Sequence, residues 1–138
     1  MYEHTENVRL AGKTYKIRCD INVLAEIQEQ LGNLQEFELN IAGLRIAENP
    51  DGTIMRDENN KIVFKRVDPS LKTIRDFLPL MLKEGNPDAD IQDAIDAVMA
   101  AKFDLYEVSV QMHKEYSKCF ERKNLSSSKR RKKPQKTK

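Results

Sequence analysis

Four aspartates form the densest group of potential metal ligands in the chain: Asp88, Asp90, Asp93 and Asp96. A calcium-binding loop requires oxygen ligands at set positions, with a glycine at the sixth and a glutamate at the twelfth. Counted from Asp88, the sixth position is Asp93 and the twelfth is Met99. The spacing therefore predicts the acidic start of a solvent-exposed helix and no metal site.

The histidines and cysteines are few and widely spaced: His4, His113, Cys19 and Cys119. Cys119 follows His113 by six residues, which is not the i, i+4 spacing that places two ligands on one helical face. The pattern supports neither a zinc site nor a Cys–His nucleophile pair. We expect both cysteines to be buried and reduced, as thiols are in the cytosol.

The five glycines lie too far apart for a phosphate-binding loop or a dinucleotide fingerprint. The G-x-S-x-G motif that presents a serine nucleophile is also absent from the sequence. Because these phosphate-binding, dinucleotide-binding and nucleophile motifs are absent, we predict that the protein is not an enzyme and uses no cofactor.

The segment Tyr15–Gly32 has the clearest folding pattern in the chain. Tyr15 and Ile17 alternate with basic residues, which is the period of a half-buried strand. Asp20 is expected to cap the helix that follows, and Gly32 is expected to end it. The buried face of this helix is predicted to consist of Val23, Leu24, Ile27 and Leu31.

Two β-hairpins are predicted beside this helix. A strand at 8–10, joined to Tyr15–Arg18 through residues 11–13, gives an N-terminal hairpin. The segment 40–67 is predicted to be β-rich, with arms at 53–55 and 62–67, because polar turn residues separate them. It could equally project from the domain as an insertion, since long polar loops cost little stability.

Three C-terminal helices complete the predicted domain. The first is expected to begin with Asp68 as its cap and Pro69 at the first helical position, and to kink or break at Pro79. A shorter helix is expected at about 88–101, and a last one from Asp104 to about residue 123. The sequence therefore predicts one α+β domain over residues 1–123.

Residues 124–138 differ sharply in composition from this domain. They contain seven Lys or Arg and no acid, so 17 of the 24 basic residues remain against 22 acids in residues 1–123, a net charge of −5. With almost no apolar residue to bury, this basic tail is expected to be disordered.

The most basic run of the tail is Lys129, Arg130, Arg131, Lys132 and Lys133. It could bind nucleic-acid phosphates, remain solvated, or attract an acidic protein. That acidic protein could be this chain's own domain or, by self-association, the domain of another copy. Nucleic-acid binding is the least favoured main function, because the domain is acidic and no aromatic residue is interleaved with the run.

Three stretches together suggest a family: YKIRCDINVLAEIQEQLG, SLKTIRDFLPLMLKEG and DIQDAIDAVMAAKFDLYEVSVQMHKEY. Their order, apolar spacing and helix caps resemble those of the small tail assembly chaperones of long-tailed bacteriophages and prophages of Gram-positive bacteria. The resemblance covers about residues 8–123 and rests on a pattern of apolar positions and caps.

The resemblance implies a non-enzymatic protein of the host bacterial cytoplasm that is absent from the mature virion. Such chaperones bind the tape measure protein, a long and mostly helical apolar chain, and help tail tube protein subunits to polymerise around it. A longer frameshifted product is common in the family, and the basic tail lies where that frameshift would fall. No membrane association is expected.

An adaptable apolar surface would suit such a partner, and Met and Phe side chains supply one. The candidate partner-binding residues are Phe77, Met81, Met99 and Met112, although core packing is the more frequent fate of such residues. The alternatives are a nucleic-acid-binding phage protein acting through the basic tail and a small structural subunit of the virion.

Overall fold

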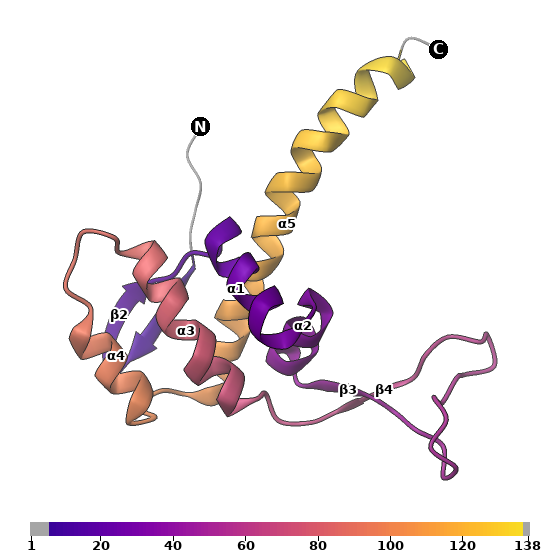
Figure 1. Cartoon of the computed structure of the whole chain (residues 1–138), viewed down its shortest axis with the longest axis horizontal. Helices are drawn as coiled ribbons and strands as arrows, with labels where there is room; N and C mark the ends of the chain where they lie inside the picture. Colours follow the sequence, from indigo (N-terminus) through magenta and orange to yellow (C-terminus); the bar gives the residue numbers. More distant parts are fainter. Residues whose placement is uncertain (1–5, 137–138) are drawn as a thin grey trace.

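The computed structural model describes residues 6–136, with the backbone alone described from residue 121 onward. Within this range the chain forms five helices and two separate two-stranded antiparallel sheets. Figure 1 shows a helical body, an arm that projects from it, and a long last helix that also extends beyond it. The α+β fold and the N-terminal hairpin predicted from the sequence are confirmed.

The first sheet pairs β1 (Asn7–Leu10) with β2 (Lys13–Lys16), so that Leu10 faces Lys13. The connection is a two-residue turn with φ of 51° at Ala11 and 81° at Gly12. Two consecutive left-handed residues match the twist of a tight hairpin. The second strand therefore begins two residues earlier than the expected start at Tyr15.

Helix α1 (Ile21–Leu31) forms as predicted. The Asp20 carboxylate accepts hydrogen bonds from the backbone N–H groups of Asn22 and Val23, and Gly32 ends the helix in the left-handed conformation. The predicted face is buried except at Leu31, which packs against the core but stays half-exposed.

Helix α2 (Leu34–Ala42) was not expected, because the apolar residues of this segment are irregularly spaced. Asn33 caps it by accepting a hydrogen bond from the Glu36 N–H at 2.7 Å, and Gly43 ends it. Phe37 and Ile41 are buried on its inner face. The predicted insertion at 40–67 consequently begins later, after this helix.

The arm consists of residues 44–66. Its base pairs β3 (Leu44–Ile46) with β4 (Phe64–Arg66). The expected hairpin between 53–55 and 62–67 is confirmed only next to its loop, where the Val63 N–H donates to the Met55 carbonyl at 3.0 Å and Arg56 and Ile62 form an isolated bridge. Residues 64–66 pair with β3 instead. Figure 1 shows the arm lying outside the helical body.

Helix α3 (Leu71–Gly85) begins later than predicted. Ser70 caps it, accepting a hydrogen bond from the Thr73 N–H at 3.2 Å; Asp68 and Pro69 precede the cap. Pro79 lies inside α3 without ending it, because Leu78 and Met81 are buried on either side and hold both halves to the core.

The last two helices are α4 (Gln92–Met99), shorter than the expected 88–101, and α5 (Leu105–Lys136). Asp104 accepts a hydrogen bond from the Glu107 N–H at 2.9 Å and so caps the last helix at its predicted start. We expected α5 to end near residue 123 and a disordered tail to follow. The backbone is instead helical to Lys136, and no glycine interrupts this stretch.

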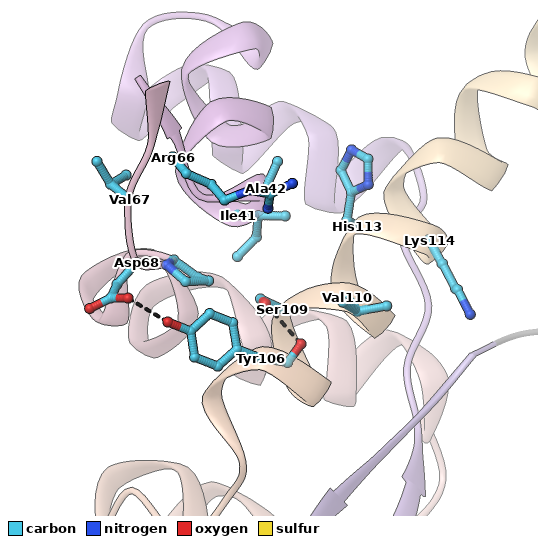
Figure 2. A pocket seen from close by; sticks show the side chains of 11 residues that line it. Ile41, Ala42, Arg66, Val67, Asp68, Tyr106, Ser109, Val110, His113 and Lys114 are labelled. Atoms are coloured by element: carbon cyan, nitrogen blue, oxygen red, sulfur yellow. Dashed lines mark hydrogen bonds between the residues drawn. The ribbon is translucent and has the colours of Figure 1, made fainter. Parts of the chain in front are cut away.

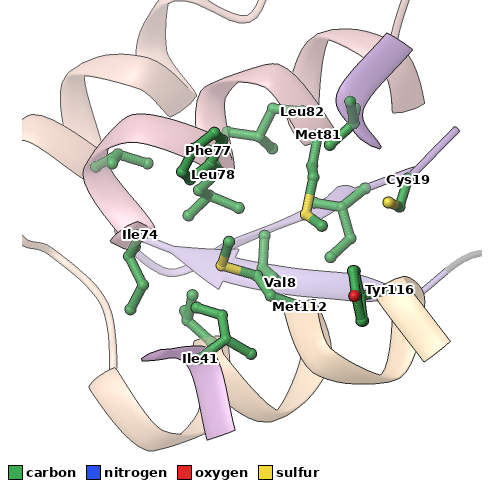
Figure 3. Close-up of a cluster of buried hydrophobic side chains, with 14 of the residues drawn as sticks. Val8, Cys19, Ile41, Ile74, Phe77, Leu78, Met81, Leu82, Met112 and Tyr116 are labelled. Carbon is green, nitrogen blue, oxygen red and sulfur yellow. The ribbon is translucent and has the colours of Figure 1, made fainter. Parts of the chain in front are cut away.

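The core lies between the first hairpin and helices α1 to α5, and Figure 3 shows its centre. Phe37 of α2 meets Phe77 of α3 edge to face, with ring centroids 5.6 Å apart, a favoured aromatic arrangement. The ring centroid of Tyr116 on α5 lies 5.0 Å from that of Phe37. In the described part of the chain, no helix is long and apolar enough to cross a membrane.

Candidate functional site

Helix α5 has two faces with different surroundings. Its core face carries Val108, Met112 and Tyr116, all buried. A second face carries Tyr106 and Val110, which are 58% and 48% exposed. Residues four apart lie on one side of a helix, so this second face forms a separate stripe that the described chain leaves uncovered.

The stripe is one wall of an open cleft of about 700 Å³, which we call the α5 cleft. The opposite wall consists of Ile41 and Ala42 at the end of α2 and of residues 66–69, which join the arm to α3. Figure 2 shows these side chains lining the cleft from three separate parts of the chain. The volume is within the range of known ligand pockets.

A hydrogen bond ties the two walls together at one end. The Tyr106 hydroxyl donates to the Asp68 carboxylate, as Figure 2 shows. This hydrogen bond and the negative charge of Asp68 raise the pKa of Tyr106 above its usual value. The Asp68 carboxylate, expected at a helix cap, is thus used in the cleft instead.

Basic groups dominate the rest of the rim. His113 Nε2 lies 3.2 Å from Glu38 Oε2, so this imidazole already faces a carboxylate. Arg66 and Lys114 are exposed, and within residues 6–120 neither has an ion-pair partner. The rim therefore presents two cations whose charge the described side chains do not neutralise.

A buried carboxylate lies on α5 outside the cleft. Glu115 is 0% exposed and accepts hydrogen bonds from the backbone N–H groups of Glu6 and Cys19, each at 3.1 Å. Lys118 pairs with the Glu6 carboxylate at 2.5 Å. These contacts join the start of the described chain to the last helix, which indicates a structural role.

The two cysteines, one hundred residues apart in sequence, meet in the fold. Cys19 is buried and Cys119 half-buried, and both remain thiols. Burial raises the pKa of the Cys19 thiol, and the hydrogen-bonded Cys119 raises it further. A high pKa leaves little thiolate, so Cys19 is a poor nucleophile.

The residues predicted to bind a partner are not gathered at one surface. Phe77, Met81 and Met112 are buried in the core, at 1%, 0% and 0% exposure, where they stabilise the fold. Only Met99 is on the surface; it lines a shallow depression with Leu71. The basic run at 129–133 lies outside the residues whose side chains are described.

The aspartate cluster has local partners. Asp90 accepts a hydrogen bond from the Gln92 N–H at 3.0 Å, and Asp96 accepts one from the Gln92 side chain at 2.9 Å. Among the described residues, no three His, Cys, Asp or Glu side chains are grouped in a way that could hold a metal ion.

The α5 cleft was missed in the sequence because its walls come from three separated segments. The available signal was the second apolar stripe of α5, Tyr106 and Val110, beside the buried one. Comparison of the chain with protein-family models, curated proteins and solved structures found no match.

Proposed function

We propose that this protein is a non-enzymatic tail assembly chaperone of a bacteriophage or prophage, which binds the tape measure protein in the host cytoplasm. The observation that carries the proposal is the uncovered second stripe of α5 at the α5 cleft. The resemblance of the three sequence stretches to this family supplies the identity of the partner.

The physical requirement of such a chaperone is modest. It must cover apolar surface on a helical chain until assembly, without changing a covalent bond. Open grooves that receive the apolar face of a helix do this in many complexes. Val110 and Val67, 48% and 36% exposed in and beside the cleft, supply apolar contact area of the kind that such a groove needs.

Co-expression with the tape measure protein of the same phage or prophage tests the proposal. The tape measure protein should be soluble with the chaperone, should aggregate without it, and should copurify with it. A tape measure protein that stays insoluble and forms no complex would refute the proposed function.

The composition of purified particles separates this function from that of a structural subunit. A chaperone is released before the tail is complete, so mass spectrometry of purified virions should not detect the chain. Its presence there in stoichiometric amounts would favour the structural subunit.

A further inference from the structure

We propose that the α5 cleft receives about two turns of an amphipathic helix whose flanking side chains are acidic. The inference rests on the proposed function only in requiring a protein partner. It adds the binding surface and the charge of the segment that is bound, both taken from the geometry of the cleft.

The apolar wall sets the length of the bound segment. The α5 side runs from Tyr106 to Lys114, and eight residues at 1.5 Å each give about 12 Å. A helix packed along this wall would bury slightly more than two turns. Its anchors would then be apolar residues at i, i+3 or i+4, and i+7, facing the exposed side chains of Tyr106, Val110 and Val67.

The rim sets the charge. Of the acids at the cleft, Asp68 accepts the Tyr106 hydroxyl and Glu38 faces His113. Arg66 and Lys114 have no ion-pair partner among the described side chains. A carboxylate on the incoming helix would pair with either cation, whereas a lysine or arginine there would be repelled.

The base of the arm, formed by β3 and β4 next to the cleft, adds to this positive charge. Arg45 and Lys65 are direct neighbours across β3 and β4, and like charges in this position destabilise a strand pair. The residues of the two strands include no acid. An anionic partner that reaches the base of the arm would relieve this repulsion.

A protein helix fits these features better than a nucleic acid. Nucleic-acid phosphates gain nothing from contact with the exposed apolar side chains of Val67 and Val110. Residues 1–123 also carry a net charge of −5, which repels a long polyanion. An acidic helix brings fewer charges and an apolar face that matches the wall.

The test uses the full chain and two synthetic helical peptides with the same apolar face, one flanked by glutamates and the other by lysines. Fluorescence anisotropy at low salt should show the acidic peptide binding about tenfold more tightly or better. The double variant R66E/K114E should lose or reverse this preference, and Val110→Asp should weaken binding of both peptides at least tenfold.

Matched controls keep the result specific. R9E/K13E makes the same charge change on the first hairpin, and Ile21→Asp places the same acid at an exposed apolar position, 69% exposed, on α1. Both should bind the acidic peptide as the unmodified chain does. Circular dichroism checks that each variant is folded. R66Q/K114Q, which removes both charges without reversing them, replaces R66E/K114E if that variant does not fold.

Three outcomes overturn the inference: equal affinity for the two peptides, no binding of either, or unchanged binding by R66E/K114E. Displacement of the acidic peptide by a single-stranded DNA oligonucleotide that itself binds R66E/K114E weakly would assign the cleft to nucleic acid instead. Co-expression separates the two proposals. If R66E/K114E keeps the tape measure protein soluble as well as the unmodified chain does, the cleft inference fails and the proposed function stands.

Discussion

Gly32 and Gly43 end consecutive helices in the same left-handed conformation, with φ of 88° and 74°, but in different surroundings. A Cβ at Gly32 would meet nothing within 4 Å, whereas one at Gly43 would lie 2.6 Å from the carbonyl oxygen of Val67. Gly43 therefore permits both the end of α2 and the close passage of the chain between the arm and α3.

The pair gives a matched prediction. Gly32→Ala should lower the free energy of unfolding by about 1 kcal/mol, the cost of a left-handed alanine. Gly43→Ala should cost about 2–4 kcal/mol, because backbone must also move. Urea denaturation of both variants measures this, and equal losses would contradict the close approach at Gly43.

The ionisation of Tyr116 should govern how the free energy of unfolding falls at alkaline pH. Burial, and then the charge of Glu38, raise its pKa to about 12, above the value of about 10 in an unfolded chain. As the pH rises, the unfolded state therefore loses the Tyr116 proton before the folded state does. The contribution of Tyr116 to the free energy of unfolding is complete below pH 10 and is lost as the pH rises from about 10 to about 12.

Tyrosinate absorbance followed against pH, together with urea denaturation at each pH, checks this expectation. Tyr116→Phe should remove a late-ionising tyrosine and flatten the fall in stability between about pH 10 and 12. It also loses the hydrogen bond to the Leu34 carbonyl, at 3.3 Å, so a constant loss at neutral pH is expected. If the free energy of unfolding of Tyr116→Phe falls with pH as steeply as that of the unmodified chain, Tyr116 ionises with an ordinary pKa.

Among the elements, α3 tolerates a feature that ought to weaken it. Pro79 cannot donate a backbone hydrogen bond to the preceding turn and clashes with that turn. The helix persists because six of its residues are buried on both sides of the proline. The sequence predicts a kink or a break at Pro79 because local preference alone favours one.

Pro79→Ala should therefore stabilise the protein by about 1–2 kcal/mol, since the cost of an interior proline of about 3 kcal/mol is partly offset by the greater entropy of the unfolded chain. Thermal and urea unfolding measure the change. Leu80→Pro, which adds a second proline to the same helix, serves as the opposite control and should destabilise strongly. A loss of stability in Pro79→Ala would mean that the ring itself packs usefully.

The arm is an element that the body does not need for its core. The one apolar side chain of residues 44–66 that is buried is Ala47, at 9% exposure, and it does not belong to the main core cluster. Ile46 and Phe64 are direct partners across the strands, so the chain can be closed there. The β-rich character of this segment was predictable, whereas its pairing depended on contacts between distant residues.

Replacing residues 47–63 by Asn-Gly should close β3 and β4 as a tight hairpin and change the free energy of unfolding by no more than about 1 kcal/mol. Circular dichroism and urea denaturation test this. Asn-Asn, which fits the turn less well, is the control for the junction. Loss of the folded state in the Asn-Gly variant would show that the arm supports the body.

At the scale of the molecule, the acidic residues 1–123 and the basic tail are expected to be separable. A chain ending at residue 123 should keep its melting temperature within about 2 °C and its binding of the acidic peptide. Any salt-sensitive binding to DNA should disappear with the tail. A large fall in melting temperature would instead show that the last part of α5 packs on the body.

The sequence by itself determined the features that depend on neighbouring residues. Asp20, Gly32 and Asp104 mark helix ends because their hydrogen bonds and backbone conformations are local. Alternating and helical spacing likewise sufficed for the first hairpin and for the buried stripe of α1. Asn33, Glu36 and Gly43 carry the same local signals for α2, but its irregular apolar spacing obscured them.

Only the tertiary structure decided which surfaces remained open. Phe77, Met81 and Met112 could have lined a binding surface, and they are buried because helices distant in sequence cover them. Glu115 finds its partners 109 and 96 residues away, and the α5 cleft joins residues 41–42, 66–69 and 106–114. Such groupings depend on how elements pack, and packing is set by the combined fit of many side chains that no local pattern in the sequence records.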